Sequence, residues 1–373
     1  MKRRTFLQNT GLSALSLAMP GYLFAQSGKS APLKVAVIGL VHGHVHGILR
    51  REKTGDVEVI AIVEPNRVLA EKYAKQHGYS MDIVFNTMEE MMAKKQPEAV
   101  TGFGTIFSHL AVVEFFAPKG IHVMVEKPLA VSLKHALRMK ELARKHNIHL
   151  LTNYETTWYA TNKKAWQYVI DEKKGGDIRK LVFHTGHQGP IEIGCNPEFL
   201  EFLTDPVLNG AGALTDFGCY GANIATWLMH GEPPQTVSCI AQHIKPSLYP
   251  KVEDEATILL TYPKTQVIIQ ASWNWPFSVK DMEVFGQTGY LKCDDRSKLH
   301  YRWKDDKKAT EEILADITPP QNDPFAYLAA VIRKQIVPAP FDLSALDNNM
   351  VVMQILEAAK KSVKTGAVVS LNV

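Results

Sequence analysis

The chain has 373 residues, of which 46% are hydrophobic and 21% are charged. This balance excludes disordered and fibrous proteins, and the length predicts more than one domain with a large buried core. The net charge is +4, and Lys2, Arg3 and Arg4 contribute to it at the very start of the chain. Since no later basic run interleaves with aromatic residues, nucleic acid is not expected as a partner.

Residues 1–32 are predicted to be an export signal followed by a linker. The segment begins with basic side chains, continues with an apolar stretch and reaches a plausible cleavage site at residues 23–25, which is the order of a secretory signal. Arg3 and Arg4 resemble the twin-arginine motif. The apolar stretch is shorter than the roughly 20 residues that span a bilayer. We therefore predict a periplasmic or otherwise exported protein with no membrane segment after signal removal.

Residues 33–152 are predicted to form an NAD-binding domain with a doubly wound parallel sheet. The apolar run 33–38 meets Gly39, which gives the strand, tight turn and helix that open a dinucleotide-binding domain. Val41 and His44 stand where the second and third fingerprint glycines are expected, so the pattern alone is weak. Strands and helices then alternate with short connections. The later predicted elements are strands at 57–63, 98–102, 123–125 and 149–152, and helices at 67–77, 88–94, 132–146 and after Ser108.

The cofactor is predicted to be NAD rather than NADP. The second strand ends at Glu64, where a carboxylate can accept both ribose hydroxyls and would repel a 2′-phosphate. His109 follows the turn after the strand 98–102 and can line the same cleft. The candidate cofactor-binding residues are Gly39, Leu40, Val41, His42, Glu64, Asn66, Gly104, Thr105, His109, Glu126 and Lys127.

No metal site is predicted. The alternating His42, His44 and His46 bring imidazoles together, but no carboxylate or cysteine joins them locally, and they fall where the cofactor pyrophosphate is expected. Neutral imidazole donors beside a phosphate are the favoured interpretation. The cysteines are widely spaced and form no CxxC pair, so they indicate neither a metal centre nor a particular disulfide.

The segment 123–128 is predicted to be a buried strand that stops at Glu126 and Lys127. Ligands of α/β sheets bind outside the carboxyl ends of the strands, which places Lys127 where chemistry occurs. Pro128 restricts the lysine to an extended backbone and so directs its side chain. Taken alone, the segment favours an ordinary solvated strand end.

Residues 153–340 are predicted to form an α+β domain with a large, mostly antiparallel open sheet, which serves as a substrate wall or a subunit interface. Residues 341–373 are expected to add a helix and a strand that pack back toward the first domain. Trp273 and Trp275 are expected to share one face of a strand. The predicted elements are strands at 256–261, 266–273, 282–285, 290–293 and 367–371 and a helix at 345–364.

Two segments of the second domain supply candidate substrate contacts. Tyr154 and Trp158 lie in an aromatic, hydrogen-bonding run that suits a sugar, although aromatic clusters at a domain junction often belong to the core. Asp216 and Tyr220 are four apart on a predicted helix that continues through Leu228, so they share a helical face. A carboxylate and a phenol so placed can hold a substrate hydroxyl and relay its proton. A helix cap and a buried tyrosine are the structural alternative.

These motifs resemble the Gfo/Idh/MocA oxidoreductases, a family that includes glucose-fructose oxidoreductase and inositol dehydrogenases. The resemblance spans residues 33–371 and is most specific at residues 126–128 and 212–220. It implies that Lys127 serves catalysis beside the nicotinamide and that Asp216 is the aspartate of the family's glycine-rich loop.

The resemblance leaves the proton acceptor open. Many members of the family have a histidine in place of Tyr220 and an aspartate in place of Asn223. A tyrosine at this position resembles the glucose-fructose oxidoreductase and dihydrodiol dehydrogenase branches. Either Lys127 or Tyr220 can therefore be the acid-base group.

The predicted activity is hydride transfer between a carbinol carbon of a sugar, glycoside or cyclitol and a tightly bound nicotinamide cofactor. Lys127 or Tyr220 takes the hydroxyl proton and Asp216 orients the hydroxyl. As a base, Lys127 needs a pKa lowered by burial near the oxidised nicotinamide. The predicted substrate contacts are Lys127, Tyr154, Trp158, Asp216 and Tyr220.

Two alternatives stay open at this point. One is an NAD-dependent glycosidase that uses transient oxidation and elimination, and the other is a non-catalytic, NAD-bound sugar sensor, because a fold alone does not prove catalysis. A homo-oligomer formed through the C-terminal sheet is expected in each case.

Overall fold

The computed structural model describes residues 31–51 and 55–371. The predicted export signal lies outside these residues and stays a prediction. From Pro32 onward the described residues belong to one compact unit. None of the described helices combines the length and the apolar character needed to cross a bilayer.

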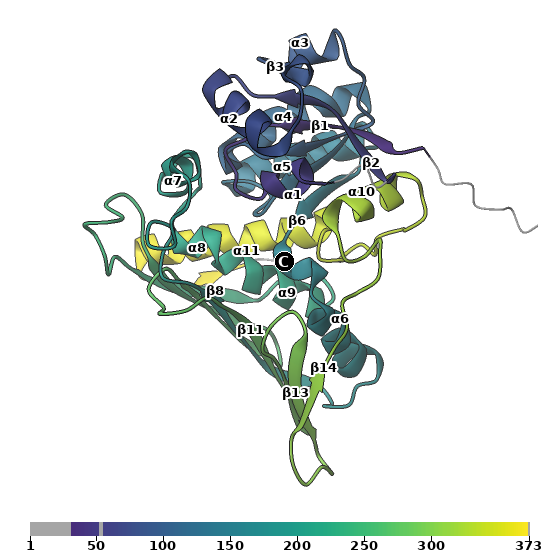
Figure 1. Cartoon of the computed structure of the whole chain (residues 1–373). Coiled ribbons are helices and arrows are strands. Elements are labelled where there is room, and N and C mark those ends of the chain that lie inside the picture. Colours follow the sequence, from purple (N-terminus) through teal and green to yellow (C-terminus); the bar gives the residue numbers. More distant parts are fainter. Residues whose placement is uncertain (1–30, 52–54, 372–373) are drawn as a thin grey trace, which may run out of the picture. The chain divides into compact units, whose positions relative to one another are not determined.

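The first sheet carries the predicted nucleotide-binding topology. Its strands are β1 (Leu33–Ile38), β2 (Val57–Val63), β3 (Val84–Phe85), β4 (Ala99–Gly102), β5 (His122–Glu126) and β6 (Leu150–Asn153). Within the described residues these six strands are parallel and lie in the order β3-β2-β1-β4-β5-β6. Figure 1 labels β1, β2, β3 and β6 of this sheet. The order reverses between β1 and β4, and such a switch point opens a ligand crevice at the carboxyl ends of the strands. The predicted doubly wound sheet is confirmed.

Helices of the first domain begin and end at residues that local chemistry favours. The helix α2 (Arg67–His77) begins where the Asn66 side chain accepts a backbone N–H of the first turn, and it ends at Gly78, whose φ is +74°. The helix α5 (Leu133–Lys145) begins at Ser132 in the same way. Both helices are as predicted. The other elements are α1 (Val45–Leu49), α3 (Met88–Met92), α4 (His109–Phe116) and the 3₁₀ turns η1 (Met81–Ile83), η2 (Ile106–Ser108) and η3 (Ala117–Lys119).

The second sheet is the large, mostly antiparallel sheet expected from the sequence. Its strands are β7 (Ile178–Gly186), β8 (Thr236–Gln242), β9 (Glu255–Thr261), β10 (Gln266–Ser272), β11 (Val279–Gly286), β12 (Gly289–Cys293), β13 (Lys298–Trp303), β14 (Thr310–Ile313) and β15 (Val369–Ser370). In the described part of the chain the nine strands lie in the order β14-β13-β12-β11-β7-β10-β9-β8-β15. Among these nine described strands, only β7 and β10 pair in parallel. The predicted fold class is confirmed.

Helices cover one side of this sheet and link it to the first domain. Those that contact its strands are α6 (Ala160–Trp166), α8 (Ala213–Asp216), α9 (Gly218–Leu228) and α11 (Leu346–Thr365). The helix α10 (Pro324–Ile332) contacts β2 of the first sheet instead. The remaining helical elements are η4 (Glu155–Trp158), the π-helical turn η5 (Gln167–Asp171) and α7 (Pro197–Leu203). The long helix α11 packs against α9 and β8 and also contacts α5 and β6 (Figure 1). The final strand β15 pairs with β8, so it extends the second sheet.

The single helix predicted to carry Asp216 and Tyr220 is wrong. The helix α8 ends at Asp216 and α9 begins at Gly218, with Phe217 between them. Gly218 packs closely on the second sheet, since a Cβ at this position would lie 2.9 Å from the Ile258 side chain. The Asp216 carbonyl oxygen accepts Lys127 Nζ, and the Tyr220 N–H donates to the Phe217 oxygen in its place. A tertiary contact therefore separates two segments that share a helical pattern.

The placement of the two tryptophans on a strand is also wrong. The strand β10 ends at Ser272, one residue before Trp273. Trp273 is fully buried and donates from Nε1 to Asp216 Oδ2 at 3.0 Å. The indole therefore serves a buried hydrogen bond and does not share a strand face with Trp275.

Candidate active site

A buried ion pair stands at the carboxyl end of β5. Lys127 Nζ donates to Asp216 Oδ1 at 2.5 Å and to the Asp216 carbonyl oxygen at 2.7 Å. The two residues are 7% and 6% exposed, respectively. Asp216 Oδ2 accepts the Trp273 indole N–H. The sequence prediction that Lys127 and Asp216 meet across the two domains agrees with this geometry.

Tyr220 lies beside the ion pair. Its ring centroid is 4.9 Å from Lys127 Nζ and 5.1 Å from Lys280 Nζ, which in turn pairs with Glu155. These are cation–π distances. The Tyr220 hydroxyl accepts and donates no hydrogen bond within residues 31–51 and 55–371, and the residue lines a cavity.

That cavity has a volume of about 380 Å³ and joins both domains. The first domain contributes the loop after β1 and Lys127, and the second contributes the segment after β7, α7, the α8–α9 junction and Lys280. The lining residues are His42, Gly43, His44, Lys127, His187, Ile193, Gly194, Cys195, Asn196, Phe199, Leu203, Asp216, Phe217, Tyr220 and Lys280. Lys127, Asp216 and Tyr220, which are far apart in the sequence, therefore face one small cleft.

The protonation states follow from burial and charge. Burial alone lowers the Lys127 pKa, but the Asp216 carboxylate and further groups outweigh it, so this pKa is raised. Burial raises the Asp216 pKa, and the Lys127 ammonium reverses that effect and lowers it. Burial, and then the charge of Glu155, raise the Tyr220 pKa well above its usual range. The protein groups alone therefore hold an ammonium, a carboxylate and a neutral phenol, and the lowering of the Lys127 pKa expected beside an oxidised nicotinamide stays a prediction.

The dinucleotide loop uses one glycine where the backbone demands it. Gly39 has φ of +83°, and a Cβ at this position would lie 2.7 Å from Gly104 Cα. The loops after β1 and β4 thus approach closely at the switch point. Val41 is partly buried against the core, so this chain packs a side chain where the fingerprint has its second glycine.

Glu64 lies at the end of β2 with 4% of its surface exposed. Its two carboxylate oxygens accept the backbone N–H groups of Leu40 and Asn66, each at 2.8 Å. A carboxylate oxygen has more than one acceptor site, so both oxygens can still receive a ribose hydroxyl. Glu64 therefore holds the loop after β1 in place, and its contact with the ribose stays a prediction.

The remaining predicted cofactor contacts differ in accessibility. The Thr105 hydroxyl caps the backbone of Ser108 at 3.2 Å. His109 is 0% exposed, and its Nδ1 lies 3.1 Å from the Leu129 carbonyl oxygen. Its Nε2 has no partner in the described part of the chain. Burial lowers the His109 pKa to about 4, so the ring is neutral and Nε2 is an unused acceptor.

His42 and His44 are joined by a carboxylate that the sequence does not place beside them. His44 Nδ1 lies 2.9 Å from Glu126 Oε2, and Glu126 Oε1 accepts Asn153 Nδ2 at 2.7 Å. The ligand atoms of His42, His44 and Glu126 lie within 4.8 Å of one another, the spacing of a possible metal site. His46 instead contacts His77. No carboxylate lies near these histidines in the sequence, but β5 brings Glu126 to the loop from a distant position, so this argument against a metal does not hold in three dimensions.

His42 is suited to donate a hydrogen bond into the cleft. Its Nδ1 accepts the His44 backbone N–H at 3.2 Å, which leaves the ring proton on Nε2. Burial lowers the His42 pKa to about 3, so the imidazole is neutral. This agrees with the neutral donor inferred from the sequence.

The structure does not bring Tyr154 and Trp158 to the cleft. Tyr154 is 0% exposed and packs edge-on to Tyr220 at 5.6 Å. Trp158 donates from Nε1 to Asn153 Oδ1 at 3.0 Å and packs against Tyr327. The chain turns into η4 directly after β6, which buries these rings in the core. Their predicted role as substrate contacts is not supported.

Sequence reasoning missed several residues of the cleft. Three of them line the cleft from segments that carry no motif: His187, Asn196 and Lys280. In addition, the Trp273 indole N–H donates a hydrogen bond to Asp216 Oδ2. His187 and Lys280 could be suspected only from their positions near strand ends. Their convergence depends on strand pairing between β7, β10 and β11.

Comparison with known proteins identifies the two domains. Residues 33–154 match the family model described as an oxidoreductase family with an NAD-binding Rossmann fold, and residues 164–292 match the GFO/IDH/MocA C-terminal domain. The chain belongs to the GFO/IDH/MocA oxidoreductase family. NAD is accordingly the cofactor of its Rossmann domain.

Curated relatives match this chain over only part of its length. The trans-1,2-dihydrobenzene-1,2-diol dehydrogenase of Oryctolagus cuniculus is 26% identical over 235 residues, which cover 61% of this chain and 65% of the relative. The matches to curated relatives span 40 to 65% of the lengths of those proteins.

Solved structures show the fold over nearly the whole chain. The aldose-aldose oxidoreductase from Caulobacter crescentus, complexed with glycerol, has a TM-score of 0.76 at 19% identity and covers 91% of this chain and 100% of that one. An inositol dehydrogenase homolog from Azotobacter vinelandii, complexed with NAD+, has a TM-score of 0.77 at 17% identity, with coverages of 92% and 98%. At these identities the likeness establishes the architecture.

Proposed function

We propose that this GFO/IDH/MocA protein transfers a hydride between a carbinol carbon of a sugar, glycoside or cyclitol and a tightly bound NAD. The observation that carries the proposal is the buried Lys127–Asp216 ion pair, which opens into a small cleft beside the loop that follows Gly39. The printed names of the relatives support the substrate class, since they concern a diol, an aldose and inositol.

The residues present fit NAD. Gly39 lets the loop approach the neighbouring strand, Glu64 offers acceptors for ribose hydroxyls, and the neutral His42 offers a donor. When bound, NAD supplies the hydride acceptor. The buried negative charge of Glu64 disfavours a 2′-phosphate and so favours NAD over NADP.

The ion pair gives the substrate proton a route. Lys127 already donates to Asp216 Oδ1, so a proton that arrives at Nζ from the substrate hydroxyl can be matched by one that leaves Nζ for Oδ1. The pair then gains one proton while the carbinol carbon loses its hydride, and charge balances. Tyr220 is held as a neutral phenol by burial, so it donates a hydrogen bond that orients the substrate and does not act as the base.

The test of this proposal is Lys127→Met, which removes the ammonium group and keeps an unbranched side chain that ends at Cε. We expect the variant to retain NAD, because Lys127 is not needed to hold the adenosine half, and to lose hydride transfer by at least about 100-fold. Mass spectrometry of the native protein measures bound NAD, and a single turnover with added sugar measures its reduction. A variant that reduces bound NAD at nearly the wild-type rate would sink the proposal.

Two further properties remain proposals. The leader motif supports export to the periplasm, and cell fractionation of the tagged chain tests it. The second sheet supports self-association through the face not covered by α9 and α11, since Ile240 and Leu259 on this sheet are 69% and 37% exposed. Sedimentation of the purified chain tests self-association, and a monomer at micromolar concentration would contradict it.

A further inference from the structure

His187 stands where the second domain meets the cleft. It directly follows β7, and its backbone is anchored on both sides: its N–H donates to the Ser272 carbonyl oxygen at 3.1 Å, and its carbonyl oxygen accepts the Trp275 N–H at 3.1 Å. The residue lines the same cavity as Lys127 and Asp216. These two hydrogen bonds fix the position of the His187 backbone, and so the position from which its side chain extends.

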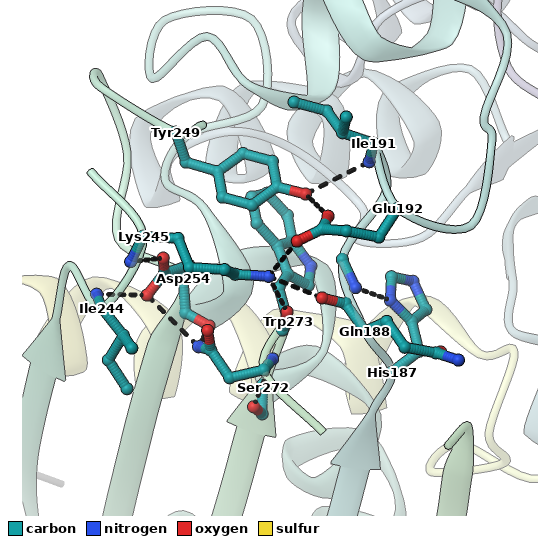
Figure 2. A network of polar contacts seen from close by, with 12 residues as sticks. His187, Gln188, Ile191, Glu192, Ile244, Lys245, Tyr249, Asp254, Ser272 and Trp273 are labelled. Atoms are coloured by element: carbon teal, nitrogen blue, oxygen red, sulfur yellow. Dashed lines mark hydrogen bonds and ion pairs between the residues drawn. The ribbon is translucent and has the colours of Figure 1, made fainter. Parts of the chain in front are cut away.

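The imidazole of His187 has one tautomer set by its neighbour. The Gly189 backbone N–H donates to His187 Nδ1 at 2.9 Å (Figure 2). A backbone N–H can only donate, so Nδ1 keeps its lone pair and Nε2 carries the proton. The ring also packs edge-on to Phe217 at 4.9 Å. His187 therefore offers the cleft a hydrogen-bond donor.

The charge state agrees with this geometry. Burial lowers the His187 pKa; Asp216 opposes the effect, while Lys280 and Lys127 add to it. The imidazole is therefore neutral near pH 7. Protonation at Nδ1 would also break the hydrogen bond from Gly189, so His187 is a poor base and a stable donor.

The segment after His187 is clamped before any substrate arrives. Lys245 Nζ donates to the carbonyl oxygens of Gln188 and Trp273, each at 2.6 Å, and pairs with Glu192, which also accepts the Tyr249 hydroxyl (Figure 2).

Gly189 also fixes this segment, because only glycine fits at the position. Its φ is +129°, and a Cβ at Gly189 would lie 2.5 Å from the Tyr249 hydroxyl oxygen. A donor held this way loses little conformational freedom on binding, which is the condition for strong and specific recognition.

We propose that His187 Nε2–H donates a hydrogen bond to a second oxygen of the substrate. The cleft would then select polyhydroxylated substrates over simple monohydric alcohols. The inference rests on the proposed function. Lys127 and Tyr220 take the hydroxyl that is oxidised, and His187 takes another oxygen of the same molecule, which fixes the carbon presented for hydride transfer. The substrate must therefore carry at least two oxygens, as in a sugar or cyclitol.

The chain offers matched substitutions to test this role. In His187→Asn the amide oxygen can accept the Gly189 N–H, but no group reaches the Nε2 position. In His187→Gln the longer side chain carries an amide N–H to about that position. His184→Asn on β7 is the control, because His184 pairs with Asp281 and does not line the cleft.

The probes are D-glucose, myo-inositol and methyl β-D-glucoside, with reduction of bound NAD as the readout. For the fastest probe, we expect His187→Asn to raise KM and lower kcat/KM by about tenfold, the value of one lost hydrogen bond. His187→Gln should recover most of this loss, and His184→Asn should match the wild type. Thermal unfolding of each variant, followed in parallel, should shift little.

Two results would overturn the inference alone: wild-type kcat/KM in His187→Asn, or equal impairment of the Asn and Gln variants together with a large loss of thermal stability. The latter would mark a structural role. Failure of the wild type to reduce NAD with any probe would overturn the proposed function and the inference with it.

Discussion

Asp216→Asn is the substitution that best separates the roles of the ion pair. In the wild type, one carboxylate oxygen accepts from Lys127 and the other from Trp273. Asparagine has the same shape but only one acceptor oxygen, so one of the two buried donors must face an NH₂ group. Breaking a buried ion pair by removing one charge costs about 3 to 5 kcal/mol, which is a large share of a typical stability of about 5 to 15 kcal/mol.

Part of that cost is relieved if Lys127 loses its proton. Without the Asp216 charge, burial remains as the main influence on Lys127 and lowers its pKa. In the wild type the Asp216 pKa is lowered and the Lys127 pKa is raised, so both groups stay charged across the neutral range and hydride transfer should vary little with pH. In the variant, transfer needs the neutral lysine and should rise with pH until the lowered lysine pKa is passed.

The assay is single-turnover reduction of bound NAD from neutral pH to about pH 9, a range that lies between the ordinary carboxyl and lysine pKa values. At neutral pH we expect Asp216→Asn to be about 10² to 10⁴ times slower than the wild type, with partial recovery as pH increases. A variant with wild-type rates and a flat profile would refute the role of Asp216 as proton acceptor. A slow variant with a flat profile would refute Lys127 as the group that first receives the proton.

Two further substitutions probe the carboxylates of the first domain. Burial raises the Glu126 pKa, but His44 and His42 reverse this effect and lower the pKa from 4.5 to about 2. The shift contributes at most about 3 kcal/mol to the free energy of unfolding. This contribution is present above the unfolded-state pKa and is lost as pH falls through the folded-state pKa. Glu126→Gln should therefore flatten the loss of stability below about pH 4.5 in denaturant unfolding, and an unchanged acid profile would contradict this. Glu64→Gln leaves one of the Leu40 and Asn66 N–H groups without an acceptor. The variant should therefore bind NAD about tenfold more weakly and discriminate less against NADP. Fluorescence titration with both cofactors measures the two affinities, and unchanged discrimination would count against Glu64 as the selecting charge.

Local chemistry made much of the fold predictable. The helix α2 could be placed to the residue because Asn66 and Gly78 are strong boundary signals. The apolar strands of the first sheet and the position of Lys127 at a strand end follow from the same kind of reasoning. Such features depend on neighbours in sequence.

What could not be predicted depends on distant contacts. The break at Phe217 accompanies the hydrogen bond from Lys127 to the Asp216 carbonyl oxygen, and the sign of the Lys127 pKa shift follows from a carboxylate on another domain. The burial of Tyr154 depends on the turn into η4 after β6, and the arrival of His187 at the cleft depends on strand pairing in the second sheet. No periodic pattern in the sequence encodes these distances.

The central claim is that this protein oxidises a carbinol of a sugar or cyclitol with a bound NAD. The most direct measurement mixes the purified protein, with the NAD it carries, with a panel of sugars, glycosides and cyclitols, and follows both nicotinamide absorbance and the organic product. The account predicts reduced NAD and a keto product in equal amounts in a single turnover. Release of an aglycone with no net reduction of NAD would indicate a glycosidase, and no change with any compound would contradict catalysis of this kind.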